Sequence, residues 1–240
     1  AFMLSEDRKY LSEFMSQITD WIDANPVGFG VNWSSTMDVA IRAANWLVGL
    51  EFFCEEENIP EDFLNTFYSS IYDHGKFIRS HFEKTKIPNN HFIADVTGLF
   101  FISVYCPFFK ESEKWKRLCI RILTREAERQ VLSDGCSFEA STSYHRLVLE
   151  MYFYTALLAD RAKVAVPGSI RETLKKMCLV SLFCIKPNGR IPQIGDNDSG
   201  RFLIFSSRPI LEHIYLLTFA SVFFRDGSFK IPGFSFDEEG

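Results

Sequence analysis

Apolar residues recur along most of the chain at the three- and four-residue spacing of an amphipathic helix. Between residues 5 and 24, for example, Leu11, Phe14 and Ile18 follow this spacing. Similar patterns fill seven further stretches, separated by glycine, proline or asparagine turns, so the sequence predicts about eight helices. The predicted helices cover approximately residues 5–24, 35–56, 59–83, 91–107, 112–131, 144–163, 167–183 and 209–224. Residues 191–205 mix a short extended run with a polar turn.

Helices with many charges alternate along the chain with helices rich in small or aromatic residues. This alternation fits an all-α incomplete toroid of helical hairpins, and an ordinary helical bundle is the alternative. In a toroid the starts of alternate helices converge on one rim. Three polar clusters stand at such starts, and they are Asn32-Trp33, Asn90-His91 and Tyr144-His145.

The composition narrows the class of protein. The chain has 240 residues with 47% hydrophobic residues, which is enough for one domain with a large core. A net charge of −5 argues against a general nucleic-acid binder, but a local basic cleft on such a protein still suits an acidic polymer. No apolar run is long enough to span a membrane. The six cysteines form no CxxC pair and are predicted to be free thiols, most of them buried.

The run Asn89-Asn90-His91 allows two interpretations. In the first, Asn89 or Asn90 caps the following helix and His91 lies at the surface. In the second, the Asn90 amide and the His91 imidazole bind a substrate carboxylate or a developing enolate oxygen.

The stretch 134–146 leads from a loop into a helix and ends in a phenol, an imidazole and a guanidinium. Tyr144 is either a core tyrosine or a catalytic acid or base whose pKa is lowered by nearby cations. His145 and Arg146 are candidates for those cations. Glu139 is a candidate to orient one of them, or to cap the helix.

Residues 195–200 include Asp196 and Asp198 but lack the spacing and the closing glutamate of an EF-hand, so a turn is predicted instead of a calcium site. Either aspartate could brace a catalytic residue at the rim. His74 is expected to be solvated on a polar helix face. The histidines and cysteines show no metal-ligand spacing, so no metal site is predicted.

Five segments follow one another along the chain: Asn32-Trp33 through Arg42 to Asn45-Trp46, Asn89-Asn90-His91, Asp134-Gly135 with Phe138-Glu139, Ser143-Tyr144-His145-Arg146, and Ile191-Pro192-Gln193-Ile194-Gly195-Asp196. As an ordered set they resemble the helical domain of the heparinase II/III-like and alginate-lyase-like polysaccharide lyases. The resemblance covers most of the chain. It implies an incomplete (α/α) toroid followed by a β-sandwich domain.

The resemblance also implies a reaction and a domain plan. Residues 1–240 are expected to form one toroid domain of a longer protein, with 225–240 starting a linker to the sandwich.

The family cleaves uronic-acid polysaccharides by β-elimination. Asn90 and His91 match the residues that neutralise the C5 carboxylate, and Tyr144 matches the tyrosine that removes the C5 proton or protonates the leaving oxygen. A further histidine or tyrosine, and sometimes zinc, comes from the sandwich, so the helical domain alone is expected to be inactive and to hold no cofactor.

These residue types suit a uronate substrate on chemical grounds. Donors beside the developing enolate lower the barrier to removing a weakly acidic proton. Arg42 and Arg146 can hold sugar carboxylates or sulfates bidentately, and Trp33 is either a sugar-stacking or a core residue. The predicted substrate-binding residues are Asn32, Trp33, Arg42, Glu139, His145 and Arg146.

Two other functions fit the sequence. A glycoside hydrolase on the same fold would use Glu139 with Asp196 or Asp198 as its acid and base. A carbohydrate-binding module would bind the acidic polysaccharide without cleaving it. Family resemblance favours a periplasmic or secreted protein, whereas unpaired cysteines fit a reducing cytoplasm. The sequence carries no signal for an oligomeric state.

Overall fold

The computed structural model describes residues 7–54, 59–197, 199–205, 209 and 211–231, and in them the predicted all-α class is confirmed. The described residues form eight α-helices: α2 (Lys9–Ala24), α3 (Thr36–Glu51), α4 (Glu61–Ser80), α5 (Asn90–Tyr105), α6 (Ser112–Gln130), α7 (Thr142–Arg161), α8 (Gly168–Cys184) and α9 (Ile214–Phe223). Two short 3-10 helices are η1 (Val31–Trp33) and η2 (Gly227–Phe229). The described residues contain no strand, and one isolated bridge joins Val131 to Ser137.

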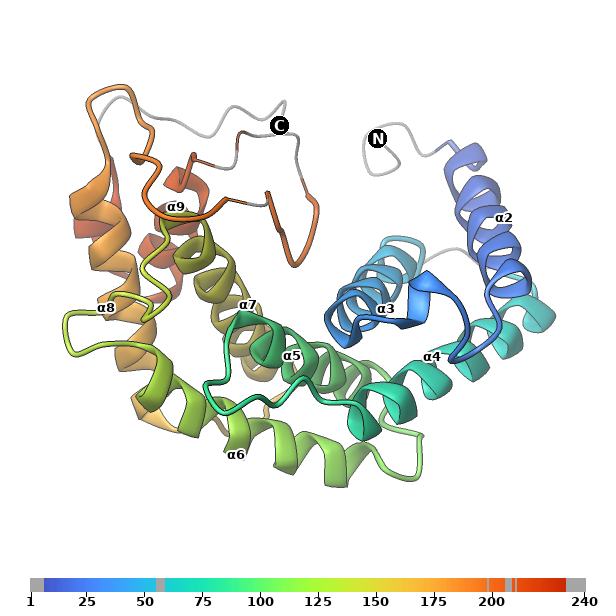
Figure 1. Cartoon of the computed structure of the whole chain (residues 1–240). Helices are drawn as coiled ribbons and strands as arrows, with labels where there is room; N and C mark the ends of the chain where they lie inside the picture. The colour runs from blue at the N-terminus through green and yellow to red at the C-terminus, as the bar shows by residue number, and fades with distance from the viewer. Residues whose placement is uncertain (1–6, 55–58, 198, 206–208, 210, 232–240) are drawn as a thin grey trace.

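The helices form an open arc of two layers (Figure 1). Helices α3, α5 and α7 pack side by side along the inner layer, and α2, α4, α6 and α8 follow the outer layer. This arrangement is the predicted incomplete (α/α) toroid. It puts the N-terminal ends of the inner helices on one side of the arc.

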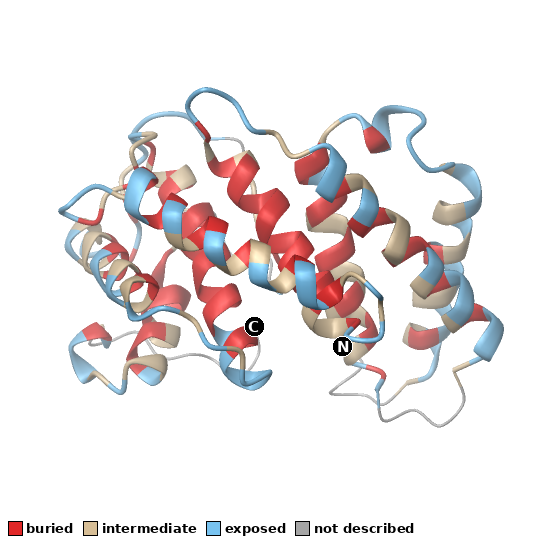
Figure 2. Ribbon diagram, turned by 90° about the horizontal axis from the view of Figure 1, so that it is seen from below, coloured by how far each residue is buried: buried red, intermediate tan, exposed pale blue. Residues whose placement is uncertain are grey.

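The burial of each helix follows its layer. Helix α5 is covered by α3, α4, α6 and α7, and 13 of its 16 residues are buried. Helix α6 instead buries one stripe that includes Trp115, Cys119 and Ile122, and it turns charged residues outward. In Figure 2 the central helices are almost continuously buried, whereas the peripheral helices alternate buried and exposed residues.

Small residues let the inner helices approach closely. A Cβ atom at Gly98 of α5 would lie 2.8 Å from the backbone of Ala40 in α3. Any side chain at position 98 therefore pushes α3 and α5 apart. The contact fixes the spacing between two of the helices whose N-terminal ends carry polar clusters.

Several helix boundaries differ from the predictions. The last helix begins at Ile214 and not at residue 209, because the preceding segment turns back and the Leu211 carbonyl accepts from the Ile191 N–H (2.8 Å). Within the predicted linker, residues 227–229 form η2, and its Phe229 is fully buried. Some predictions fall outside the described residues: the start of the first helix, the end of the second at 55–56, Asp198, and the tail at 232–240.

Candidate active-site rim

Hydrogen bonds join the N-terminal ends of α3, α5 and α7 into one surface, which we call the rim. It comprises residues 34–37, 81–91 and 137–144. The Thr36 hydroxyl donates to the carbonyl of His81 (2.7 Å), and the Met37 N–H donates to Glu83 (3.1 Å). Segments far apart in sequence are thereby held side by side.

Glu83 is the junction between α3 and α5. Its Oε1 accepts from the Ser35 hydroxyl (3.3 Å) and the Met37 N–H, and its Oε2 lies 2.7 Å from His91 Nδ1. Burial alone would raise the pKa of Glu83, but the hydrogen bonds from Met37 and His91 outweigh it and hold this pKa below its ordinary value. A carboxylate can only accept, so His91 Nδ1 carries a proton. The His91 side chain is 43% exposed.

Asn90 is held by a second carboxylate. Its backbone N–H donates to Glu139 Oε2 (3.2 Å) and its side-chain Nδ2 donates to Glu139 Oε1 (2.8 Å). The predicted side-chain cap of α5 by an asparagine is therefore not formed, because Glu139 satisfies the Asn90 N–H and the Asn89 side chain makes no cap bond. Asn90 is buried, with 4% of its surface exposed.

Tyr144 lies in the first turn of α7, a few residues beyond Glu139. Ser141 caps this helix by accepting from the Tyr144 N–H (3.2 Å) and also donates to the carbonyl of Asp196 (2.6 Å). The loop that carries Asp196 comes this close because Gly195 has φ +70 and no Cβ, which would otherwise lie 2.7 Å from the carbonyl oxygen of Ala140. Tyr144 is half-buried at this junction.

Asp95 lies directly behind the rim. It is fully buried, and its Oδ2 accepts from the backbone N–H of Glu83 (2.7 Å). Burial raises the pKa of Asp95 to about 8, so its carboxyl group is protonated at neutral pH.

Trp33 and Arg42, which were predicted to contact sugars, both have partners within the fold. Trp33 is 4% exposed, and its indole N–H donates to the carbonyl of Asn25 (3.2 Å). The Arg42 guanidinium stacks 4.1 Å from the Trp21 ring centroid, and its Nε donates to His74 (3.0 Å). Burial lowers the pKa of Arg42 to about 10. His74 was expected in solvent but is completely buried under this cation.

Asn32 lies at the edge of the same aromatic cluster. Its side chain is exposed and donates to the side-chain oxygen of Asn25 (2.6 Å), and its carbonyl accepts from Arg42 (3.0 Å). The Asn32 side chain is therefore accessible to a ligand, whereas the Arg42 guanidinium is held by contacts within the protein.

His145 and Arg146 also have structural partners in place of the predicted substrate. Both ring nitrogens of His145 are occupied, by the Ser137 N–H (3.3 Å) and the carbonyl of Met177 (3.1 Å). Burial lowers the pKa of His145 to about 4, so it is not a cation that could activate Tyr144. Arg146 is fully buried and pairs with Glu150 (2.5 Å) one helical turn further along α7.

Three residues that support the rim, Glu83, Asp95 and Glu150, were not identified from the sequence. Arg146 and Glu150 are four residues apart, a spacing that predicts a helical ion pair. Glu83 had no comparable local signal, because its contacts to residues 35–37 join positions more than forty residues apart. The role of Asp95 could not be read from the sequence, because the residues around it follow an apolar helical pattern.

The described residues hold no group of three or more histidine, cysteine or acidic side chains placed to bind a metal ion. No helix among them is long and apolar enough to cross a membrane. All six cysteines are free, and Cys106, Cys119 and Cys178 are buried.

Comparisons with known proteins match the chain to one family. Residues 1–213 match the sequence model described as "Heparinase II/III N-terminus". The heparin-sulfate lyase of Pedobacter heparinus is 25% identical over 198 residues, which cover 80% of this chain and 29% of that protein. The heparin-sulfate lyase of Bacteroides thetaiotaomicron is 26% identical over 193 residues, covering 78% and 27%.

Solved structures share the fold. A crystal structure of heparinase III superposes with a TM-score of 0.73 and 22% identity, covering 94% of this chain and 35% of that one. A heparan sulfate lyase from Pedobacter heparinus gives a TM-score of 0.70 at 22% identity, covering 97% and 38%. The chain spans less than a third of the length of the curated relatives it matches.

Proposed function

The chain belongs to the heparinase II/III family of polysaccharide lyases, and from this we propose that it is the helical part of an enzyme that cleaves a uronic-acid-containing polysaccharide by β-elimination. The relatives named heparin-sulfate lyase make a heparan-type glycosaminoglycan the first polymer to test.

One observation carries the proposal. Asn90 and His91 are adjacent in sequence, yet each is held by a different carboxylate from a distant segment, Glu139 for Asn90 and Glu83 for His91. Glu139 lies in the loop that begins the Tyr144 helix. The amide and the imidazole are thus held at one rim by groups that only accept hydrogen bonds, an arrangement that fixes where their remaining donors point.

In the proposed reaction the rim stabilises charge that develops at the substrate carboxylate. The second amide hydrogen of Asn90 binds the C5 carboxylate as it takes on enolate character. His91 adds a second donor in its imidazolium form, in which Nε2 also carries a hydrogen. Preorganised donors of this kind contribute about 3 kcal/mol each to lowering a barrier. Glu139 is then a positioning residue, because its carboxylate would repel the substrate's own.

Tyr144 completes the proposed reaction as acid or base. The C5–H bond and the C4–O bond break, a double bond forms between C4 and C5, and the proton reaches the leaving oxygen. A positioned phenol contributes about a hundredfold to ten-thousandfold to such a transfer. His145 and Arg146 have no part in this step, because one is neutral and the other is paired with Glu150.

The described residues do not favour the hydrolase alternative. Both oxygens of Glu139 accept hydrogen bonds from Asn90, and Asp196 is anchored through its backbone carbonyl while its side chain is exposed. Asp198 lies outside the described residues.

The test is the chemistry of the products in water enriched in heavy oxygen. Full-length protein is incubated with heparan sulfate and other uronate polymers, and the new chain ends are analysed by mass spectrometry. Elimination yields ends without the label and one unsaturated uronate for each cut. A labelled, saturated end would establish hydrolysis and overturn the proposal, and binding without cleavage across the panel would leave only the binding function.

A further inference from the structure

The outer face of α6 carries a row of cations that the rim does not use. Lys114, Arg117, Arg121 and Arg125 follow one another at three- and four-residue spacing and are all exposed, so they share one side of the helix. From residue 114 to residue 125, at about 1.5 Å per residue, the row extends roughly 16 Å. We call it the α6 basic face.

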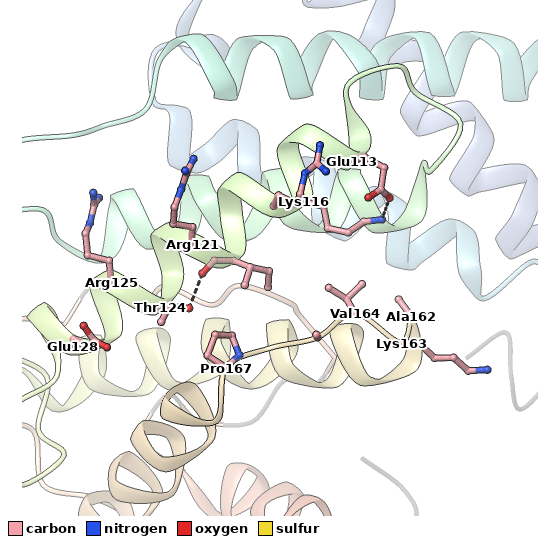
Figure 3. Close-up of a pocket in the computed structure, with 13 residues that line it drawn as sticks. Glu113, Lys116, Arg121, Thr124, Arg125, Glu128, Ala162, Lys163, Val164 and Pro167 are labelled. Atoms are coloured by element: carbon pink, nitrogen blue, oxygen red, sulfur yellow. Dashed lines mark hydrogen bonds and ion pairs between the residues drawn. The ribbon is translucent and has the colours of Figure 1, made fainter.

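Two hollows flank this row. One has a volume of about 820 Å³ between α6 and the segment 162–167, which adds Lys163. The other has a volume of about 340 Å³ and adds Arg79 from the end of α4. Arg117 and Arg121 line both hollows. Figure 3 shows Arg121 and Arg125 extending from the same side of α6, away from Pro167.

The charge of this face is not neutralised by its neighbours. Helix α6 carries six cations and three acids, a net charge of 6 − 3 = +3, in a chain whose net charge is −5. Glu113 pairs with Lys116, the buried Glu126 pairs with Arg125 of the face itself, and Glu128 lines the larger hollow. Among the described residues neither Arg117 nor Arg121 has a hydrogen bond or ion pair to its side chain. Two exposed guanidinium groups are thus left for an external anion.

We propose that the α6 basic face is a second binding site for the acidic polysaccharide, separate from the rim; this inference rests on the proposed function. Guanidinium groups bind sulfate and carboxylate oxygens bidentately, and the open hollows on either side admit a polymer of sugar rings. Helix α6 also leads toward the rim, because the carbonyl of Gln130 at its end accepts from the Phe138 N–H (2.9 Å), next to Glu139.

A chain that contacts both sites gains affinity because the second contact is intramolecular. Long polysaccharides should therefore bind more tightly than oligosaccharides that fill the rim alone. The α6 basic face sets a preference for chain length, and the rim retains its own affinity for short substrates.

The test compares the double variant Arg117→Gln/Arg121→Gln with the control Arg225→Gln/Lys230→Gln. The control removes the same charge from exposed positions near α9 and η2. Both are made in full-length protein that also carries Tyr144→Phe, so that no probe is consumed. Fluorescence anisotropy measures the binding of labelled heparin chains and of a heparin tetrasaccharide at several salt concentrations.

We expect the Arg117/Arg121 variant to bind long heparin about tenfold more weakly than the control, with a shallower salt dependence. Tetrasaccharide binding should not change. Equal affinity of the two variants for long heparin would overturn the inference. An equal loss for long and short probes would do the same, because it would indicate damage to the rim.

Two further experiments distinguish this polysaccharide site from a general polyanion surface and from a failure of the proposed lyase function. Competition by single-stranded DNA as strong as that by long heparin would show a general polyanion surface and overturn the polysaccharide assignment. If the protein without Tyr144→Phe cleaves no polymer while heparin binding still depends on Arg117 and Arg121, the second site stands and the proposed lyase function fails.

Discussion

Two buried histidines are each held in a single neutral tautomer by their neighbours. His74 Nε2 accepts from Arg42, so its proton lies on Nδ1 and is donated to the carbonyl of Ser70 (2.7 Å). His145 has the opposite arrangement, with the proton on Nε2. Burial lowers the pKa of His74 to about 3. Neither ring is charged at neutral pH.

The role of Glu139 as a positioning residue is tested by Glu139→Gln. Glutamine has one acceptor oxygen in place of two, so it can keep only one of the two hydrogen bonds from Asn90. We expect kcat to fall about tenfold, the loss of roughly one hydrogen bond in the transition state, while KM and the pH profile stay the same. The matched control is Asp196→Asn, whose exposed carboxylate should be dispensable. A shifted pH profile for Glu139→Gln, or loss of activity in Asp196→Asn, would instead indicate an acid and base pair of carboxylates.

Asp95 predicts a pH dependence of stability. Its pKa rises from 3.8 to about 8 on folding, so between these values the unfolded chain has lost the proton and the folded protein keeps it. Stability therefore falls as pH rises through this window, by up to about 1.4 kcal/mol per pH unit from this group. Asp95→Asn keeps an acceptor for the Glu83 N–H and cannot ionise.

The free energy of unfolding, measured in urea at pH 5 and pH 8, should therefore rise in Asp95→Asn relative to the wild type as pH increases. The control Asp20→Asn, at an exposed position of α2, should follow the wild type at both values. Parallel curves for Asp95→Asn and the wild type would show that Asp95 is ionised in the folded protein.

At the scale of elements, helix α7 carries both a rim residue and a buried anchor. Glu150 pairs with Arg146, its Oε2 accepts from the Phe202 N–H (3.1 Å), and the Tyr215 hydroxyl donates to Oε1. Arg146 also donates to the carbonyl of Gly200. The anchor therefore ties α7 to α9 and to the segment 200–202, and it keeps the N-terminal turn of α7 at the rim.

Glu150→Ala should destabilise the protein by about 3–5 kcal/mol, because it leaves the Arg146 charge buried without a partner. The double variant Arg146→Leu/Glu150→Leu removes both charges and should recover much of that loss. Urea denaturation of the three proteins gives the comparison. A double variant no more stable than Glu150→Ala would mean that shape and hydrogen bonding at this site matter more than charge.

At the scale of the whole molecule, the sequence predicted the toroid because its helices differ in burial. Helix α5 is apolar on all sides and α6 on one stripe, and this difference is visible as hydrophobic periodicity. The supports of the rim were not predictable in this way, because Glu83 and Glu139 reach their partners across 46 and 49 residues. Burial of Arg146 was equally hidden. For Trp33 the sequence left a core and a surface position open, since aromatic side chains occupy both.

The two proposed functional surfaces lie on different layers of the arc. The rim lies at the N-terminal ends of the inner helices, and the α6 basic face lies on the outer layer (Figure 1). The loop between α6 and α7, which contains Glu139, connects the two surfaces along the chain.

The most direct measurement is the ultraviolet absorbance of the unsaturated uronate released by full-length protein. It compares the wild type, Tyr144→Phe, and the control Tyr68→Phe on the outer helix α4. The account predicts equal rates for the wild type and Tyr68→Phe, and a rate at least about a hundredfold lower for folded Tyr144→Phe. Cleavage by Tyr144→Phe at the wild-type rate would contradict the assignment of the rim as the catalytic site.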